Sequence, residues 1–435
     1  MSKTFATVFA VLFVFASASF AQWEFVKNFP DDNFKGGTGS HGIAVDPDGK
    51  VWIQLFGITD SVETDTGKVG VRVLYVFNPD GSPAPFSPIK TITVGGVTDT
   101  LFKATNNSNR GLRPDHEGNI LASIAQTVYR LDYKTGAGLA KVIPQATSLT
   151  AVGVSDNGDV YVGKVLPNNP LQILDKDFNV IGNVVDSTVG FSRSLEVSGD
   201  GNTVFWAGYT NHAIYKYNRP DEFSDFGVPD TVLKGFDSES CAWNPKTGYL
   251  WFSAGSYNDL PNRFPGAVTS WSPGGWYAYD VVADQVVDSL KWNFFTPANI
   301  NERPRGIDFS VGGDTAYVGC FGASDFPAVQ MFVNRGAVKV AERPSSIPEG
   351  YALSQNFPNP FNPTTEIKFS IGKAGLASIK VYTLLGEEVA TVVEKIYPAG
   401  DHRITFDASR LSTGTYVYEL RSNGVRLTNK MTFMK

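Results

Sequence analysis

Cysteine and histidine are scarce in this sequence. Its 435 residues include two cysteines, Cys241 and Cys320, and four histidines. Two thiols cannot form a disulfide-stapled fold, and we expect two separate buried thiols, although adjacent repeats could also bring them into disulfide range. No His-Glu-x-x-His zinc motif occurs. The sequence therefore predicts little histidine-based metal or proton-transfer chemistry.

Charge and long apolar segments are also limited. Charged residues make up 18% of the chain, the formal net charge is −6, and no dense run of Lys and Arg occurs. Nucleic-acid backbones are bound by clustered positive charge, so we expect no nucleic-acid partner. Outside the N-terminus no segment is long and apolar enough to predict a transmembrane helix.

The first 21 residues have the pattern of a removed export signal. Lys3 supplies a short positive region, residues 5–15 are apolar, and the small residues Ser19 and Ala21 precede a cleavage point at Gln22. The apolar run is shorter than the roughly 20 residues that span a bilayer as a helix. The sequence predicts a signal peptide over residues 1–21 and a mature protein outside the cytoplasm.

Glycine and proline, in contrast, are abundant, with 43 and 25 copies, and 42% of the residues are hydrophobic. This composition favours many short strands joined by turns. The stretch from His41 to Ile53 contains an apolar strand, an Asp-Pro-Asp-Gly turn and a second apolar strand. That order is typical of a β-hairpin.

Six copies of this hairpin recur at intervals of 40 to 69 residues, and their turns begin at Asp46, Asp115, Ser155, Ser198, Asn244 and Ser310. Most copies continue into a third strand, predicted at residues 71–77 in the first copy, so each repeat has the length of a four-stranded β-propeller blade. The two long intervals predict insertions at residues 95–109 and 255–266. We expect the strand-like residues 23–26 to complete the last blade and close the ring. The prediction is a six-bladed propeller over residues 22–340, with a hidden seventh blade as the alternative.

The turn motif Gly-Ile-Ala-Val-Asp-Pro-Asp-Gly at residues 42–49 resembles the repeats of the six-bladed NHL, gluconolactonase-like and YVTN propeller families. The resemblance covers about residues 22–340. Proteins with this motif have many unrelated functions, so the resemblance implies the fold and not an activity.

The character of the chain changes after a short polar linker at residues 341–349. Three prolines within residues 353–365 exclude a helix and impose an extended lead-in. Alternating patterns then predict strands at residues 366–371, 378–382, 389–393, 402–406, 415–420 and 426–433. About seven short strands predict a small immunoglobulin-like β-sandwich over residues 350–435, which makes the whole chain all-β.

Three motifs of this module are distinctive. They are Asn-Phe-Pro-Asn-Pro-Phe-Asn-Pro at residues 356–363, Val-Tyr-Thr-Leu-Leu-Gly-Glu-Glu-Val at 381–389 and Leu-Ser-Thr-Gly-Thr-Tyr at 411–416. Together they resemble the type A C-terminal sorting domain of the type IX secretion system. The resemblance implies handling by the type IX machinery, passage across the outer membrane and a secreted or surface location. The alternative is an ordinary sandwich used for adhesion or as a spacer.

A ring of polar residues is predicted at one mouth of the axial channel. The first strand of each blade starts there, so the residue five positions before each turn should face the mouth. These residues are His41, Arg110, Thr150, Arg193, Glu239 and Arg305. Guanidinium groups match carboxylates and phosphates, so the ring could bind an anionic or carbohydrate ligand. Alternatively its charges pair with one another, Arg193 or Arg305 with Glu239.

The same ring is also relevant to the hypothesis that the propeller is an enzyme. Gluconolactonase-like propellers hold a divalent metal with Glu, Asn and Asp side chains of this ring, and the segment around Glu239 resembles their glutamate segment. Most other ring positions here are arginine, which offers no lone pair to a cation. We therefore expect no metal and no other cofactor. A sugar-acid or lactone hydrolase or lyase using Glu239 and His41 for proton transfer is the second hypothesis.

The leading hypothesis is a non-catalytic recognition or scaffold module that is exported by type IX secretion and contacts its ligand at the arginine-rich mouth. A purely structural surface protein is the third hypothesis. The aromatic turn from Trp271 to Trp276 is predicted to pack between blades, with stacking on sugar rings as the alternative.

Overall fold

The computed structural model describes residues 23–35, 39–101, 109–145, 148–208, 210–254, 274–293, 303–321, 327–335, 350–383, 388–423 and 425–435, except for the side chains of residues 109, 110 and 303. The chain divides into two compact units, Met1–Ala337 and Val338–Lys435. The predicted signal peptide and the predicted linker lie outside the described residues, so these boundaries stay predictions.

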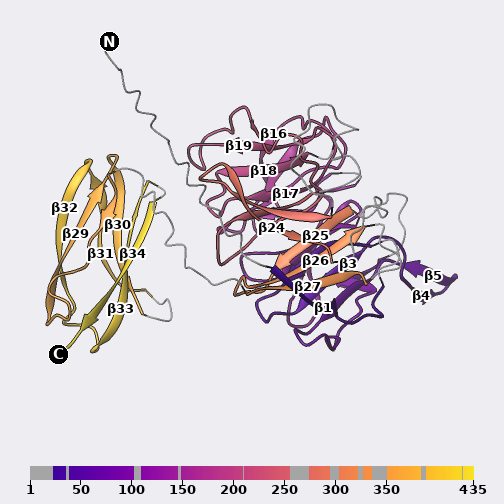
Figure 1. Cartoon of the computed structure of the whole chain (residues 1–435), viewed down its shortest axis with the longest axis horizontal. Helices are drawn as coiled ribbons and strands as arrows, with labels where there is room; N and C mark the ends of the chain where they lie inside the picture. Colours follow the sequence, from indigo (N-terminus) through magenta and orange to yellow (C-terminus); the bar gives the residue numbers. More distant parts are fainter. Residues whose placement is uncertain are drawn as a thin grey trace, which may run out of the picture. The chain divides into compact units, whose positions relative to one another are not determined.

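The first unit is a six-bladed β-propeller (Figure 1). Five blades are four-stranded antiparallel sheets and one is a three-stranded sheet. The first strands of the blades contact one another in sequence around a closed ring, and the last contacts the first. These strands are β2 (Ser40–Val45), β9 (Asn109–Pro114), β13 (Gly153–Val154), β17 (Ser192–Val197), β21 (Cys241–Trp243) and β25 (Arg303–Phe309). The prediction of six blades is confirmed, and the described residues contain no seventh.

The remaining strands follow outward in each blade. The second strands are β3 (Val51–Leu55), β10 (Ile120–Ile124), β14 (Val160–Val162), β18 (Thr203–Gly208), β22 (Leu250–Ala254) and β26 (Thr315–Phe321). The third strands are β6 (Leu74–Phe77), β11 (Thr127–Leu131), β15 (Leu171–Leu174), β19 (Ala213–Asn218), β23 (Gly275–Asp280) and β27 (Val329–Asn334). The outer strands are β12 (Gly138–Val142), β16 (Val180–Val185), β20 (Asp230–Val232), β24 (Gln285–Lys291) and β1 (Trp23–Phe29).

The N-terminal strand closes the ring, as the sequence predicts. β1 pairs antiparallel with β27, with Trp23 opposite Asn334 and Phe29 opposite Val329. The last blade is therefore built from both ends of the propeller sequence, which ties the first blade to the sixth. Phe29 is fully buried and packs edge-on against Tyr317 of β26, with ring centroids 4.9 Å apart.

The first blade departs from the predicted layout. The predicted third strand at residues 71–77 is split, because Val71 ends a separate hairpin of β4 (Asp60–Thr64) and β5 (Gly67–Val71) that projects from the blade (Figure 1). A second hairpin, β7 (Thr91–Val94) and β8 (Val97–Thr100), follows. The insertion therefore begins well before residue 95, and isolated bridges at Pro83 and Ile89 take the place of a fourth strand. The other predicted insertion, residues 255–266, lies outside the described residues.

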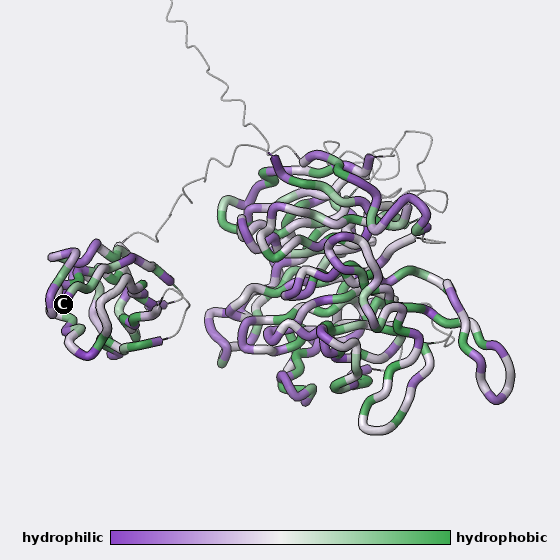
Figure 2. Tube along the Cα trace, turned by 90° about the horizontal axis from the view of Figure 1, so that it is seen from below, coloured by the Kyte–Doolittle hydropathy of each residue, from purple (hydrophilic) through white to green (hydrophobic). Residues whose placement is uncertain are grey.

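The blades are held together by apolar layers between neighbouring sheets. Trp52, Trp206, Trp251 and Trp276 are all buried to 1% exposure or less. Trp276 of the fifth blade shares a buried cluster with Ile307 and Phe309 of the sixth blade, which agrees with the predicted inter-blade packing; Trp271 lies outside the described residues. Hydrophobic stretches along the strands alternate with hydrophilic stretches at many of the turns (Figure 2).

The repeated turns are fixed by their first residue. The Asp46 carboxylate accepts hydrogen bonds from the backbone N–H groups of Asp48 (3.0 Å) and Lys50 (2.9 Å) and from Trp52 Nε1 (2.9 Å). Asp115 repeats the pattern in the second blade. This local chemistry explains why the turns are visible in the sequence.

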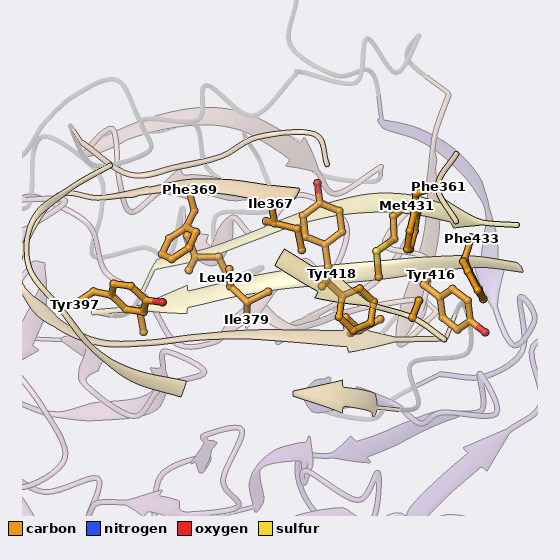
Figure 3. Packing of buried hydrophobic residues seen from close by; sticks show 14 of the residues in the cluster. Phe361, Ile367, Phe369, Ile379, Tyr397, Tyr416, Tyr418, Leu420, Met431 and Phe433 are labelled. Atoms are coloured by element: carbon orange, nitrogen blue, oxygen red, sulfur yellow. The ribbon is translucent and has the colours of Figure 1, made fainter. Parts of the chain in front are cut away.

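The second unit is a β-sandwich of seven strands, β28 (Ala352–Leu353), β29 (Thr364–Ile371), β30 (Gly375–Tyr382), β31 (Glu388–Tyr397), β32 (Gly400–Asp407), β33 (Gly414–Ser422) and β34 (Val425–Phe433). They form sheets in the orders β28-β29-β32 and β31-β30-β33-β34. A single core that includes Ile367, Ile379 and Met431 fills the space between the sheets (Figure 3). The buried Tyr418 hydroxyl donates to Ser354 O (2.7 Å) and accepts from Asn356 N (2.8 Å), which ties the proline-rich lead-in to β33.

Candidate functional site

The six predicted mouth positions lie at one end of the inner strands. His41, Arg110, Arg193 and Arg305 lie near the start of β2, β9, β17 and β25, and Thr150 and Glu239 precede β13 and β21. The side chain of Arg110 is outside the described part of the chain. Because the inner strands are neighbours around the ring, these six positions lie at one end of the same set of strands.

Three of the six side chains form one ion cluster, which we call the mouth cluster: Arg193, Glu239 and Arg305. The two carboxylate oxygens of Glu239 are each bound by an Nη1 atom, Oε2 by that of Arg193 and Oε1 by that of Arg305. This is geometrically possible because the fifth blade lies between the fourth and the sixth. The predicted pairing of Glu239 with an arginine is observed, and it involves both arginines.

The members of the mouth cluster differ in accessibility. The side chains of Glu239 and Arg305 are each 1% exposed, whereas that of Arg193 is 20% exposed. Two guanidinium groups face one carboxylate, so the cluster carries a formal charge of about +1. Arg193 is therefore the member that an external ligand can reach.

Arg305 and His41 are held by aromatic rings. The Arg305 guanidinium lies over the Phe321 ring, 5.1 Å from its centroid, and its backbone carbonyl accepts a hydrogen bond from Trp276 Nε1 (3.0 Å). The His41 ring stacks on Phe56 at 4.9 Å and meets Phe321 edge-on at 5.5 Å. His41 is 3% exposed, so its imidazole is a packed part of the wall rather than a group open to the channel mouth.

Thr150 has a structural role in the ring. It is fully buried, and its Oγ1 lies 3.2 Å from the carbonyl oxygen and 3.3 Å from the amide nitrogen of Gly163. The Thr150 amide also donates to the same carbonyl at 2.9 Å. These contacts clamp the start of the third blade.

A second charged layer lies three residues further along the same strands. We call it the axial plug, and it was not predicted. It consists of Arg113, Glu196 and Asp308 on β9, β17 and β25. Arg113 Nη2 pairs with Glu196 Oε1 and donates to the backbone carbonyl of Cys241 at 2.6 Å. Because Cys241 belongs to the fifth blade and Arg113 to the second, this side chain crosses the propeller interior.

The plug follows an alternation around the ring. The equivalent positions in the first, third and fifth blades are the small residues Ala44, Gly153 and Ala242. Small and charged residues thus alternate from blade to blade, which leaves room for three charged side chains in one narrow layer. That alternation is the sequence signal from which the plug could have been found.

Burial shifts the acidity of the plug. Desolvation raises the pKa of Glu196 to about 7 and that of Asp308 to about 6, although the Arg113 charge opposes both shifts. The Asp308 carboxylate also accepts hydrogen bonds from Val45 N (2.7 Å) and Phe309 N (2.9 Å). Both carboxyl groups consequently change protonation state between acid and neutral pH.

The thiols and carboxylates of the described residues give no metal centre. Among these residues no group of three or more His, Cys, Asp or Glu side chains is placed to hold a metal ion. Cys241 and Cys320 are both buried, and the Cys241 sulfur lies 3.1 Å from Ser194 Oγ. Burial raises the pKa of Cys241 well above its usual range, which makes it an inert thiol.

Comparison with known proteins identifies the second unit. Residues 355–434 match the family of secretion system C-terminal sorting domains. No curated protein matches the chain. In the described residues no helix is long and apolar enough to cross a bilayer.

Solved structures with a similar course of the chain share little sequence with it. A luciferin-regenerating enzyme is 13% identical, with a TM-score of 0.46, over 72% of this chain and 96% of that one. A gluconolactonase from Xanthomonas campestris is 13% identical, with a TM-score of 0.44, over 73% and 95%. A protein of unknown function from Bacteroides caccae is 10% identical, with a TM-score of 0.42, over 68% and 91%. Likeness at this level gives no indication of activity.

The sorting family accounts for the three motifs of the C-terminal module. Proteins that carry this domain are exported by type IX secretion and reach the cell surface or the medium. The chain is thus an exported β-propeller whose residues 355–434 are a secretion system C-terminal sorting domain.

Proposed function

We propose that the propeller is a non-catalytic recognition module that binds a carboxylate-bearing ligand at the mouth cluster. The observation that carries this proposal is the imbalance of charge at the mouth: two guanidinium groups share the single carboxylate of Glu239, and the exposed member is Arg193. An incoming anion meets a net positive charge beside a low-dielectric wall, where the attraction is screened less than in water.

The arrangement of the same residues speaks against proton-transfer chemistry. A general base needs a carboxylate free to accept a proton within hydrogen-bond reach of the substrate. Both oxygens of Glu239 are bound by arginine, and His41 is packed against Phe56 and Phe321. These contacts make the lactone hydrolase the weaker candidate, and a purely structural protein would not need an exposed arginine at this position.

Binding of oligogalacturonate, a carboxylate-bearing oligosaccharide, tests the proposal by titration calorimetry on the mature chain. The variant Arg193→Gln should bind at least about tenfold more weakly, and binding of the unaltered protein should weaken with added salt. Arg335→Gln is the matched control, because Arg335 is an exposed arginine paired with Glu24 outside the mouth cluster. Equal binding by Arg193→Gln and the unaltered protein, or no binding by either, would refute the proposal.

A further inference from the structure

We infer that the propeller has a second, independent ligand site for a neutral, hydroxyl-rich oligosaccharide, in a groove between the outer parts of the third and fourth blades. We call it the rim groove. Its volume is about 290 Å³, near the lower end for small-molecule sites. The lining residues are Asp159, Ile173, Ile181, Gly182, Asn183, Arg219 and residues 222–226.

The rim groove lies at the end of the blades opposite the mouth cluster. One wall is β16, and the other is the loop of residues 219–229 that joins β19 to β20. β17 begins at the mouth, so β19, two antiparallel strands later, ends away from it. The groove is open at Gly182, where an added Cβ would meet no heavy atom within 4 Å.

The loop that forms the groove is anchored at both ends. Arg219 donates to Asn202 Oδ1 (3.1 Å) and to the carbonyl of Glu222 (3.2 Å), and its guanidinium lies over the Phe226 ring at 4.8 Å. Phe226 packs against the apolar layer between the two blades, and Gly227 N donates to Asn218 O at 2.9 Å. The wall is therefore a built part of the structure, and its guanidinium is already engaged within it.

Phe223 is the residue that points to a ligand. It lies three positions before the anchored Phe226, lines the groove and is 92% exposed. Ile181, 56% exposed, contributes an apolar side chain from the other wall. An exposed aromatic ring beside a groove is a favourable stacking surface for the apolar face of a sugar, and covering it removes apolar surface from water.

The polar lining matches hydroxyl groups. Asp159, Glu222 and Asp225 supply carboxylate acceptors, and Asn183 supplies an amide that both donates and accepts. Sugar hydroxyl groups donate hydrogen bonds to such carboxylates, and one carboxylate can accept from two neighbouring hydroxyls. The groove is lined by three carboxylates and by one guanidinium that already has partners, so its net charge is negative. It should therefore repel polyanionic glycans and favour neutral ones.

A peptide that adds to the edge of β16 is the competing occupant. Such addition requires a regular strand edge. β16 has two register irregularities against β15, one beside Leu171 and one beside Ile173. Bulges twist an edge away from a regular partner strand and block strand addition, so the observations favour the sugar.

Titration of the mature chain with cellohexaose, maltohexaose and mannohexaose tests the inference. At least one should bind, and Phe223→Ala should weaken that binding about tenfold or more. Gly182→Trp, which adds bulk to the open groove without removing any group, should also abolish it. Val228→Ala is the matched control, because Val228 is 94% exposed in the same loop but does not line the groove.

Several outcomes overturn the inference. These are the absence of binding to all three hexasaccharides, unchanged binding in Phe223→Ala, an equal loss in Val228→Ala, or binding of a hexalysine peptide in place of the sugars. Arg193→Gln should leave hexasaccharide binding unchanged. A failure of the mouth proposal therefore remains distinguishable from a failure here.

Discussion

Arg113 in the second blade and Glu196 in the fourth form an ion pair inside the propeller, and the same Arg113 Nη2 donates to the backbone of the fifth blade at Cys241. One side chain thus connects the second blade with the fourth and fifth blades, which are not its neighbours in the ring. The stability of the propeller should depend on this contact more than on surface ion pairs, because the side chains of Arg113 and Glu196 are only 11% and 3% exposed.

Removing the Arg113 charge should destabilise the propeller. Arg113→Met leaves the carboxyl groups of Glu196 and Asp308 buried without their cation, which costs about 3–5 kcal/mol at pH 8, where both are ionised. The loss should shrink at pH 5, since both groups can then be protonated. Calorimetric unfolding at the two pH values measures the loss of stability. An equal loss at pH 5 and pH 8 would contradict the role of Arg113 as the cation that balances these buried carboxylates.

Glu196 should give the propeller a measurable pH dependence. Its folded pKa is raised from 4.5 to about 7 by burial, so the native state holds the proton more tightly than the unfolded chain. Its contribution to stability is complete below pH 4.5 and is lost as the pH rises through about 7. Relative to Glu196→Gln, the unaltered protein should lose roughly 3 kcal/mol of unfolding free energy across that window.

Urea unfolding of the unaltered protein and of Glu196→Gln, from pH 4 to pH 8, measures how the stability that depends on Glu196 changes with pH. Glu24→Gln is the control, because the Glu24 side chain is 44% exposed and pairs only at the surface. A constant difference between the unaltered protein and Glu196→Gln at all pH values would show that Glu196 titrates normally in the fold.

Much of this architecture was predictable because its signals are local. The turn at Asp46 and its five counterparts carry their own hydrogen-bond acceptors, so spacing alone gave six blades and the ring positions from His41 to Arg305. The split third strand of the first blade was not predictable, because Val71 and Leu74 look alike as strand residues and only pairing assigns them to different sheets.

The axial plug was missed for a different reason. Strand periodicity places residues i and i+3 on opposite faces. Bulges near the start of β9, β17 and β25 add one residue, which brings Arg193 and Glu196, or Arg305 and Asp308, to the same side. The alternation of small and charged residues was visible in the sequence, but the bulges that bring its charged members to the side of the mouth cluster depend on the partner strand and are not visible there. The rim groove likewise requires packing between residues 181–183 and 222–226.

Replacement of Arg72, unlike that of Arg113, should stabilise the fold. It is 4% exposed, and in the described part of the chain its Nε and Nη1 atoms have no hydrogen-bond partner. Burial lowers its pKa, so replacement by an apolar side chain should stabilise the fold. Arg72→Met should raise the free energy of unfolding by about 1–3 kcal/mol.

Arg130→Met is the matched control for Arg72→Met. Arg130 pairs with Asp115 at 2.8 Å and lies over the Phe178 ring at 4.4 Å, so its replacement should destabilise. Both variants are compared by denaturant unfolding. A lower free energy of unfolding for Arg72→Met than for the unaltered protein would contradict this account. It would mean that the interactions of the Arg72 guanidinium contribute more free energy than its burial costs.

Deletion of residues 350–435 should abolish export across the outer membrane while leaving the propeller folded. The sandwich has its own hydrophobic core, so its removal exposes no propeller interior. Cell fractionation with an antibody against the propeller should find the truncated chain in the periplasm, with an unfolding temperature close to that of the intact propeller. Truncated protein in the medium would mean that the sorting domain is dispensable.

The affinity of Glu239→Gln for oligogalacturonate tests the central claim most directly. If the mouth recognises an anion through Arg193, loss of the competing carboxylate raises the net charge of the mouth cluster from about +1 to about +2 and should tighten binding. The glutamine retains an acceptor oxygen for the two arginines. Tighter binding by a folded Glu239→Gln variant is the predicted result, and weaker or lost binding by that folded variant would contradict the account.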